Sequence, residues 1–233
     1  TESGNNPAAS VQANPTAGFS LITYTGTGAA GTIAHGLGAV PKWIIIKNRD
    51  ATDNWAVYHG ANGSTDPETD YLILNLNNAV ADSANWWNDT APTSSVFTVA
   101  TDHAVNADGE KYVAYVFAEV EGYSKFSHYI ANNSTNGQFV YLGFRPAFVL
   151  YKHSGTNAWN MWDTKRPNMV SNTMFGFLQP AATTAEGNTN LFIDFLSNGF
   201  KLYEASGYYN NPAGGLFMYM AFAEQPFKYS NAR

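Results

Sequence analysis

The sequence carries one pattern twice, and this internal repeat restricts the possible fold more than any other feature. Leu37–Lys47 reads LGAVPKWIIIK and Leu142–Lys152 reads LGFRPAFVLYK, so both segments combine Leu-Gly-x-x-Pro, an apolar run and a final Lys. Pro146 follows Pro41 by 105 residues. Self-similarity at a fixed spacing is typical of chains built from similar structural units. We therefore expect two related halves.

A second block keeps the same spacing. Tyr115–Glu119 (YVFAE) and Met220–Glu224 (MAFAE) are again 105 residues apart, and Asn106 is matched by Asn211 at the same distance. Because two separated blocks keep one order and one spacing, we interpret the chain as a tandem duplication.

Two further blocks differ slightly in spacing. Phe19–Ser20 and Phe126–Ser127 are 107 residues apart, whereas Phe97 and Phe200 are 103 apart. Loops that gained or lost one or two residues account for such differences, since loops tolerate changes of length better than strands.

The ends of the two copies predict the domain organisation. Residues 1–17 are small and polar, contain two prolines and show no apolar period, which is typical of a linker. We expect the first β repeat over residues 18–125 and the second over 126–233.

The fold class predicted by the residue pattern is all-β. Aromatic residues make up 15% of the chain and charged residues 13%, against about 25% charged residues in a typical domain. Short runs rich in Val, Ile, Tyr, Phe and Trp alternate with turn residues, as in a β-sandwich or jelly roll. The expected strands are 19–24, 31–35, 42–48, 55–59, 71–75, 95–99 and 111–119, followed by 126–130, 138–142, 147–152, 159–163, 191–195, 200–204 and 216–223. Tyr112–Ala118 is expected to be buried on both faces. The pattern leaves open whether the two repeats form one sandwich or two.

Charge and composition argue against several classes of partner. The chain has 12 Lys and Arg against 18 Asp and Glu, with no basic cluster to neutralise phosphates, so nucleic acid is not expected. No apolar run reaches the ~18 residues of a membrane span, and no membrane insertion is expected. With 0 Cys there is no thiolate metal site or disulfide framework.

The motifs typical of catalysis and cofactor binding lack their context. Gly26–Gly31 reads GTGAAG after a strand, but the following residues are β-branched and broken by glycine rather than helical, which favours a hairpin turn over a dinucleotide loop. The five histidines show no metal-ligand spacing. Glu119 and Glu224 occupy matching repeat positions, whereas an acid and a base need different environments. We expect no enzyme, no cofactor and no metal.

Three aromatic patches differ between the copies and are the predicted ligand-binding residues. Aromatic faces beside amide, carboxylate and guanidinium groups suit a sugar, because the ring faces stack and the hydroxyls find planar partners. The alternative interpretation is that these aromatics lie in the core or at subunit contacts. The residues are Trp86, Trp87, Trp162, Asp163, Arg166, Tyr208 and Tyr209.

Three segments together resemble a known family. The repeated Leu-Gly-x-x-Pro pattern, Asn88–Phe97 (NDTAPTSSVF) and Tyr112–Phe126 (YVAYVFAEVEGYSKF) resemble a repeat family found in tail-fibre and other virion surface proteins of bacteriophages, especially phages of marine bacteria. The resemblance covers about residues 19 to 228. It implies a location on the virion surface, outside the cell, other virion proteins as partners, and a homotrimer. The second copy lacks the NDTAPTSSVF segment in full, so one shared ligand site is not expected.

The leading functional hypothesis is a tail-fibre or receptor-binding domain that attaches non-covalently to host surface polysaccharide. One alternative is a purely structural capsid or tail decoration protein. A second alternative is a glycan depolymerase on a jelly-roll scaffold, with its carboxylates supplied by Glu119, Glu121, Asp163 and Asp194.

Overall fold

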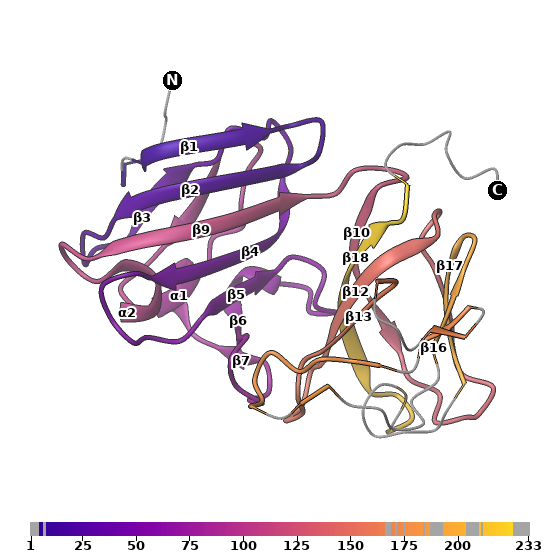
Figure 1. Ribbon diagram of the computed structural model, residues 1–233. Coiled ribbons are helices and arrows are strands. Elements are labelled where there is room, and N and C mark those ends of the chain that lie inside the picture. Colours follow the sequence, from indigo (N-terminus) through magenta and orange to yellow (C-terminus); the bar gives the residue numbers. More distant parts are fainter. Residues whose placement is uncertain are drawn as a thin grey trace. The chain divides into compact units, whose positions relative to one another are not determined.

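The computed structural model is an all-β protein, as predicted, in which nearly every element is an antiparallel strand (Figure 1). The structure describes residues 5–6, 8–165, 169–170, 172–174, 176–183, 185–186, 193–203, 210 and 212–225. The chain divides into two compact units, of which unit 1 comprises residues 1–75 and 80–119 and unit 2 comprises residues 76–79 and 120–233.

Unit 1 has two layers around one core. A seven-stranded sheet in the order β1-β2-β9-β4-β5-β6-β7 is faced by the two-stranded sheet β3-β8. Their apolar faces enclose the core, in which Ile22 and Ile44 of the large sheet meet Ile33 and Phe97 of the small one. The elements are β1 (Ala8–Asn14), β2 (Phe19–Thr25), β3 (Gly31–Ala34), β4 (Pro41–Asn48), β5 (Ala56–His59), the 3₁₀ turn η1 (Pro67–Thr69), β6 (Asp70–Ile73), β7 (Ala81–Asp82), α1 (Ala84–Trp87), β8 (Val96–Val99), α2 (His103–Asn106) and β9 (Lys111–Ala118).

Unit 2 is also a two-layered sandwich. The sheet β10-β18-β12-β13 faces the sheet β11-β17-β16-β15-β14. Val149 and Phe217 of the first sheet pack with Val140 and Phe200 of the second in the core. The strands are β10 (Ser124–Ile130), β11 (Phe139–Tyr141), β12 (Pro146–His153), β13 (Asn160–Asp163), β14 (Met169–Val170), β15 (Thr173–Met174), β16 (Ile193–Leu196), β17 (Gly199–Leu202) and β18 (Leu216–Ala223).

The two units share strand order and register. The order β2-β9-β4-β5 in unit 1 corresponds to β10-β18-β12-β13 in unit 2. The ladder between β4 and β9 shifts register between Pro41 and Trp43, and the ladder between β12 and β18 shifts between Pro146 and Phe148, at the same place in the pattern. Proline is tolerated there because an irregular ladder does not need its missing N–H. A tandem duplication predicts this agreement.

The ladders correct one detail of the repeat alignment. Phe19 pairs with Phe117 and Ser124 pairs with Phe222, so β2 and β10 correspond at 105 residues and not at the 107 inferred from the Phe-Ser pairs.

A buried asparagine holds the corresponding loops of each unit. Asn106 Oδ1 accepts hydrogen bonds from Thr27 N (2.9 Å) and Asn6 Nδ2 (2.8 Å), and its Nδ2 donates to the carbonyls of Ala29 (2.7 Å) and Ala100 (2.6 Å).

In unit 2 Asn210 makes the corresponding contacts, and Asn211, the expected counterpart, lies outside the described residues. Asn132 N donates to Asn210 Oδ1 at 3.0 Å, and Asn210 Nδ2 donates to Ser134 O at 2.9 Å. Buried amides of this kind fix loop conformation because each polar atom needs a partner.

Three other sequence-based expectations need correction. Residues 8–14 of the expected linker form β1, which pairs with β2 along its length. The Gly26–Gly31 segment is not a hairpin but connects β2 of one layer to β3 of the other. β9 is not buried on both faces, because Tyr112, Ala114, Val116 and Ala118 are buried whereas the residues between them are partly exposed.

Replacing the buried amide in unit 1 tests its structural role. Asn106→Ala removes four hydrogen bonds and leaves buried groups without partners, so we expect the free energy of unfolding to fall by about 2 to 3 kcal/mol. Chemical denaturation measures this change. The exposed Asn136 is the matched control, and Asn136→Ala is expected to stay within about 0.5 kcal/mol of the parent chain. Equal stability of the two variants would contradict the assignment.

Candidate binding groove

Trp86 and Trp87, the first of the predicted ligand-binding patches, do not lie at the surface. They belong to the short helix α1, which begins after Ser83, whose side chain accepts a hydrogen bond from Asn85 N, and ends at Asn88 in the left-handed region. Both indoles are buried, with 6% and 2% of their surface exposed. Trp86 stacks on Tyr71 at 3.9 Å between ring centroids. Neither ring face is therefore open to a sugar.

The second predicted patch is also part of the core. Trp162 on β13 is 0% exposed and stacks on Tyr151 with ring centroids 4.6 Å apart. Asp163 follows it on the opposite face of the strand, and its Oδ1 accepts from Lys165 N at 3.0 Å. Arg166, Tyr208 and Tyr209, the remaining predicted ligand residues, lie outside the described residues.

The carboxylates of the enzyme alternative are spread over the fold. Glu119 and Glu121 are exposed beyond the end of β9. Asp163 lies on β13 of one sheet and Asp194 on β16 of the other, where Asp194 accepts a hydrogen bond from Thr173 Oγ1 at 2.5 Å. Within the described ranges, no group of three His, Cys, Asp or Glu side chains is placed to hold a metal ion.

Glu224 forms an ion pair. Its Oε2 lies 3.0 Å from Arg145 Nε, and both side chains are partly exposed. This contact agrees with a structural role for the carboxylate that ends the repeat, although exposed pairs contribute little to stability.

The lysine that ends each Leu-Gly-x-x-Pro pattern ties down the next turn. Lys47 Nζ donates to the carbonyls of Ala51 (3.0 Å) and Asp53 (2.8 Å). Lys152 Nζ likewise donates to His153 O (2.5 Å) and Gly155 O (2.7 Å). Lys152 is fully buried, and desolvation lowers its pKa from the ordinary 10.5 to about 8.

An open groove lies in unit 2 at one rim of the sandwich. It has a volume of about 330 Å³ and is lined by β10 and β11, each of which is the outer strand of its sheet among the described strands. Tyr219 of the neighbouring strand β18 also contributes to the lining. The groove therefore lies where the two layers of the sandwich separate.

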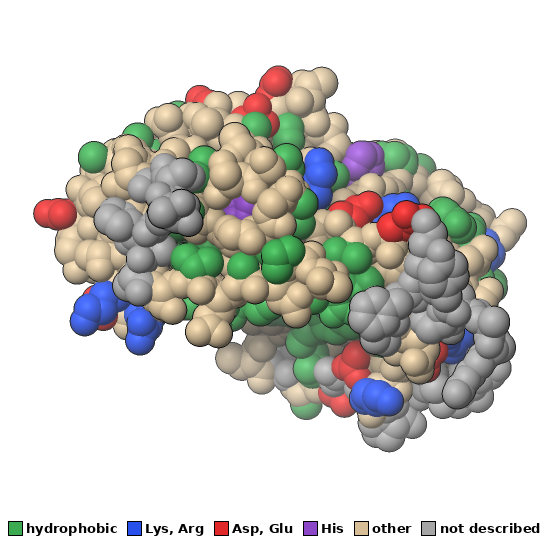
Figure 2. All heavy atoms as spheres, turned by 90° about the horizontal axis from the view of Figure 1, so that it is seen from above, with side chains coloured by type: hydrophobic (Ala, Val, Ile, Leu, Met, Phe, Trp, Pro, Cys, Tyr) green, Lys and Arg blue, Asp and Glu red, His purple; other side chains and the backbone are tan. Residues whose placement is uncertain are grey.

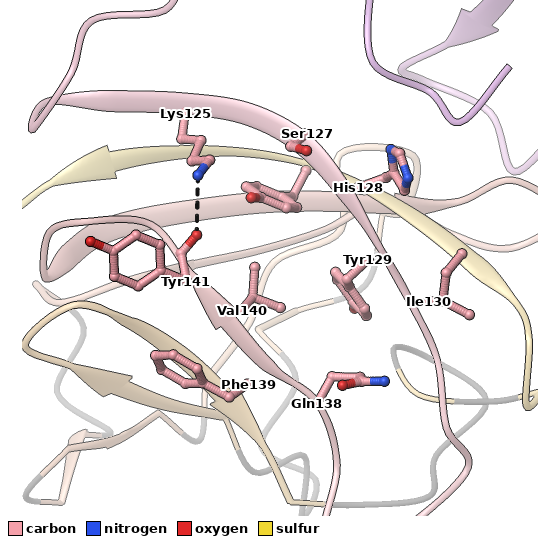
Figure 3. A pocket seen from close by; sticks show the side chains of 10 residues that line it. Lys125, Ser127, His128, Tyr129, Ile130, Gln138, Phe139, Val140 and Tyr141 are labelled. Atoms are coloured by element: carbon pink, nitrogen blue, oxygen red, sulfur yellow. Dashed lines mark hydrogen bonds between the residues drawn. The ribbon is translucent and has the colours of Figure 1, made fainter. Parts of the chain in front are cut away.

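The groove combines exposed aromatic and polar side chains (Figure 3). Tyr141 is 60% exposed and Phe139 41%, far more than expected of core aromatics. Lys125 Nζ donates to Tyr141 O at 3.3 Å and lies 5.6 Å from the centre of the Tyr141 ring. The other lining residues are Ser127, His128, Tyr129, Ile130, Gln138 and Val140.

The face drawn in Figure 2 shows no large field of one charge. On the face drawn in Figure 2, acidic and basic side chains are scattered among uncharged polar and apolar ones. Recognition at such a surface depends on shape, hydrogen bonds and aromatic contact more than on long-range attraction.

None of the residues that line the groove was among the predicted ligand residues. A signal was present, because Phe139 and Tyr141 flank the core residue Val140 and so point to the other face of their strand. The corresponding residues of the first copy, Thr32 and Ala34, are small.

One family profile matches residues 3–226, which covers both units. The chain belongs to the family described as Domain of unknown function (DUF7483). Searches of curated proteins and of solved structures find no significant match. Membership of this family therefore assigns no activity.

In the part of the chain that the structure describes, no helix has the length and apolar character needed to cross a membrane.

The buried position of Trp162 predicts a large loss of stability on truncation. Trp162→Ala removes a fully buried side chain from the core of unit 2, so we expect the free energy of unfolding to fall by about 3 to 5 kcal/mol. Tyr141→Ala, at an exposed position, is expected to change it by less than about 0.5 kcal/mol. Denaturant titration followed by circular dichroism compares the two. A Trp162→Ala chain as stable as the parent would contradict the core assignment.

Burial of Lys152 predicts a specific pH dependence. Between pH 8 and 10 the unfolded chain keeps the Lys152 proton while the folded chain has released it, so stability rises with pH in this window. Relative to Lys152→Met, the parent chain should gain about 2 kcal/mol in free energy of unfolding between these two pH values. Denaturation of both proteins across the window measures the difference. Parallel profiles would show that the ammonium is not desolvated.

Proposed function

We propose that this protein is a non-covalent attachment module of a bacteriophage virion surface, and that the groove between β10 and β11 contacts its partner. The single observation that supports the proposal is the exposure of Tyr141, Phe139 and Ile130 at 60%, 41% and 44% around one open rim. Clustered exposed apolar side chains in a groove are typical of binding sites.

The polar side chains of the groove favour binding over chemistry. Lys125, Ser127 and Gln138 offer an ammonium, a hydroxyl and a carboxamide beside the aromatic rings. These groups give direction to an interaction through hydrogen bonds, while the rings supply contact area.

The virion setting rests on the resemblance to phage tail-fibre repeats. In that setting the partner is another virion protein or a host surface polysaccharide, and the assembled protein is a homotrimer on the virion surface, outside the cell. The protein would join or attach structures without changing them.

Binding to two panels tests the proposal. The purified chain is presented to bacterial surface polysaccharides and to purified virion proteins, and we expect a partner in at least one panel. Tyr141→Ala is expected to weaken that binding about tenfold or more, because it removes the most exposed ring of the groove.

Tyr203→Ala is the matched control. Tyr203 is 39% exposed and also lies beneath a lysine, with Lys201 Nζ 5.4 Å from its ring centre, but it does not line the groove. Equal loss in both variants would place the contact elsewhere. Absence of any partner would refute an attachment role, and new reducing ends on a bound polysaccharide would identify an enzyme instead.

A further inference from the structure

The rim of unit 1 that corresponds to the groove is closed by the N-terminal segment. β1 pairs with β2 from Ala8↔Tyr24 to Asn14↔Phe19. Just before β1, Asn5 and Asn6 cross to the other layer and bond to Thr32 of β3. Residues 5–6 and 8–14 thus contact both layers at this rim.

The main chain of Thr32 is what the segment binds in the small layer. His35 N donates to Ser95 O. In an antiparallel pair every second residue forms hydrogen bonds with the partner strand, so in β3 these residues are Gly31, Ile33 and His35. The N–H and C=O of Thr32 therefore point away from β8. Asn6 N donates to Thr32 O at 2.9 Å, and Thr32 N donates to Asn5 Oδ1.

Phe139 of β11 holds the position of Thr32 in unit 2. Leu202 N donates to Gln138 O and Leu142 N donates to Asn198 O, so Gln138, Val140 and Leu142 face β17. The N–H and C=O of Phe139 therefore point away from β17. The equivalent side of Thr32 in unit 1 is where Asn5 and Asn6 bind. In the described part of the chain, no hydrogen bond to the N–H or C=O of Phe139 is found.

The core-facing side chains of β2 and β10 differ in exposure, as expected if the rim of unit 1 is covered and the rim of unit 2 is open. Ile22 of β2 is 0% exposed, whereas Ser127, at the corresponding place in β10, is half-buried and lines the groove. Ser20, which is also 0% exposed, corresponds to Lys125, whose ammonium reaches Tyr141 O. At the rim of unit 2, Ser127 thus replaces the buried Ile22 and Lys125 replaces the buried Ser20, and the described residues of this unit include no segment that covers the rim.

We propose that the groove of unit 2 binds an extended polypeptide segment of a partner chain, which adds to the edge of β11 through the main chain of Phe139. This inference rests on the proposed attachment function and names the class of its partner. Addition of a strand to an open sheet edge is a general mode of peptide recognition, in which main-chain hydrogen bonds supply affinity and side-chain pockets supply specificity.

The segment that closes unit 1 indicates the chemistry of the partner. Residues 5–14 read NNPAASVQAN, with small and amide side chains and no charge. A Cβ on Gly31 would lie 1.8 Å from Asn6 Oδ1, so unit 1 leaves room there for the amide of its segment. Unit 2 has Gln138 at this place and supplies a carboxamide itself, which favours a small residue in the partner.

Amide hydrogen exchange at Phe139 tests the inference in the full chain. The outward N–H of Phe139 is expected to exchange fast in the free protein, while the N–H of Val140 in the ladder exchanges slowly. The probe is the synthetic peptide NNPAASVQAN at millimolar concentration. It should slow exchange at Phe139 at least tenfold and leave exchange at Thr32, which is already bonded, unchanged.

Two substitutions at one position separate main-chain from side-chain recognition. Phe139→Pro removes the outward N–H without touching the ladder bonds of Gln138 and Val140, since proline is tolerated on an edge strand. Phe139→Ala keeps the N–H and removes the ring. We expect Phe139→Pro to abolish peptide binding and Phe139→Ala to weaken it only a few fold.

Each other outcome overturns the inference. Equal loss in both variants would assign binding to the ring, and slow exchange at Phe139 in the free chain would show a covered edge. If Phe139→Pro fails to fold, the exchange measurement on the parent chain decides alone. Polysaccharide binding that depends on Tyr141, without peptide binding, would overturn the inference and leave the attachment function standing. Absence of binding to the peptide, to the polysaccharides and to the virion proteins would refute both.

Discussion

Each unit depends on the pairing of its last strand with two strands from its first half. β9 lies between β2 and β4, and β18 lies between β10 and β12. These ladders bring together residues that are far apart in the sequence, from Asn48↔Tyr112 to Phe19↔Phe117. Register decides which face of a strand reaches the core, because a slip of one residue turns every side chain over. The register shifts after Pro41 and Pro146 lie in these ladders. The lysine at the end of each apolar run lies on the same strand, β4 or β12.

The fold was largely predictable because its strands are short, aromatic and separated by turns. The edges of β4, β9 and β12 were placed within about two residues, which is the ordinary uncertainty of strand ends. β1 was missed because AASVQAN has almost no apolar alternation, and only its partner β2 makes it a strand. The four-residue helix α1 was missed because its Ser83 cap and the left-handed Asn88 are local signals too short to outweigh a polar context.

The candidate site was not predicted, and the reason is physical. Trp86, Trp87 and Trp162 are large, and large aromatics next to polar residues occur in cores as readily as at surfaces. Comparison of the copies did not single out the groove residues, because it was applied to aromatics beside polar residues and not to the matching positions of β3 and β11. The difference that matters for the groove lies in a strand, where Phe139 of β11 stands at the position of Thr32 in β3. It could be interpreted only after the structure showed that the N-terminal segment covers the rim of unit 1.

The central place of β9 and β18 has a consequence for biosynthesis. While the chain leaves the ribosome, β2 and β4 wait without the strand that joins them until Lys111–Ala118 has been made, and β10 and β12 wait in the same way for Leu216–Ala223. Long-range pairing of this kind is slow, and unpaired edges in nascent chains associate readily with one another. Growing copies on one messenger RNA therefore expose matching strand edges before β9 or β18 has been made.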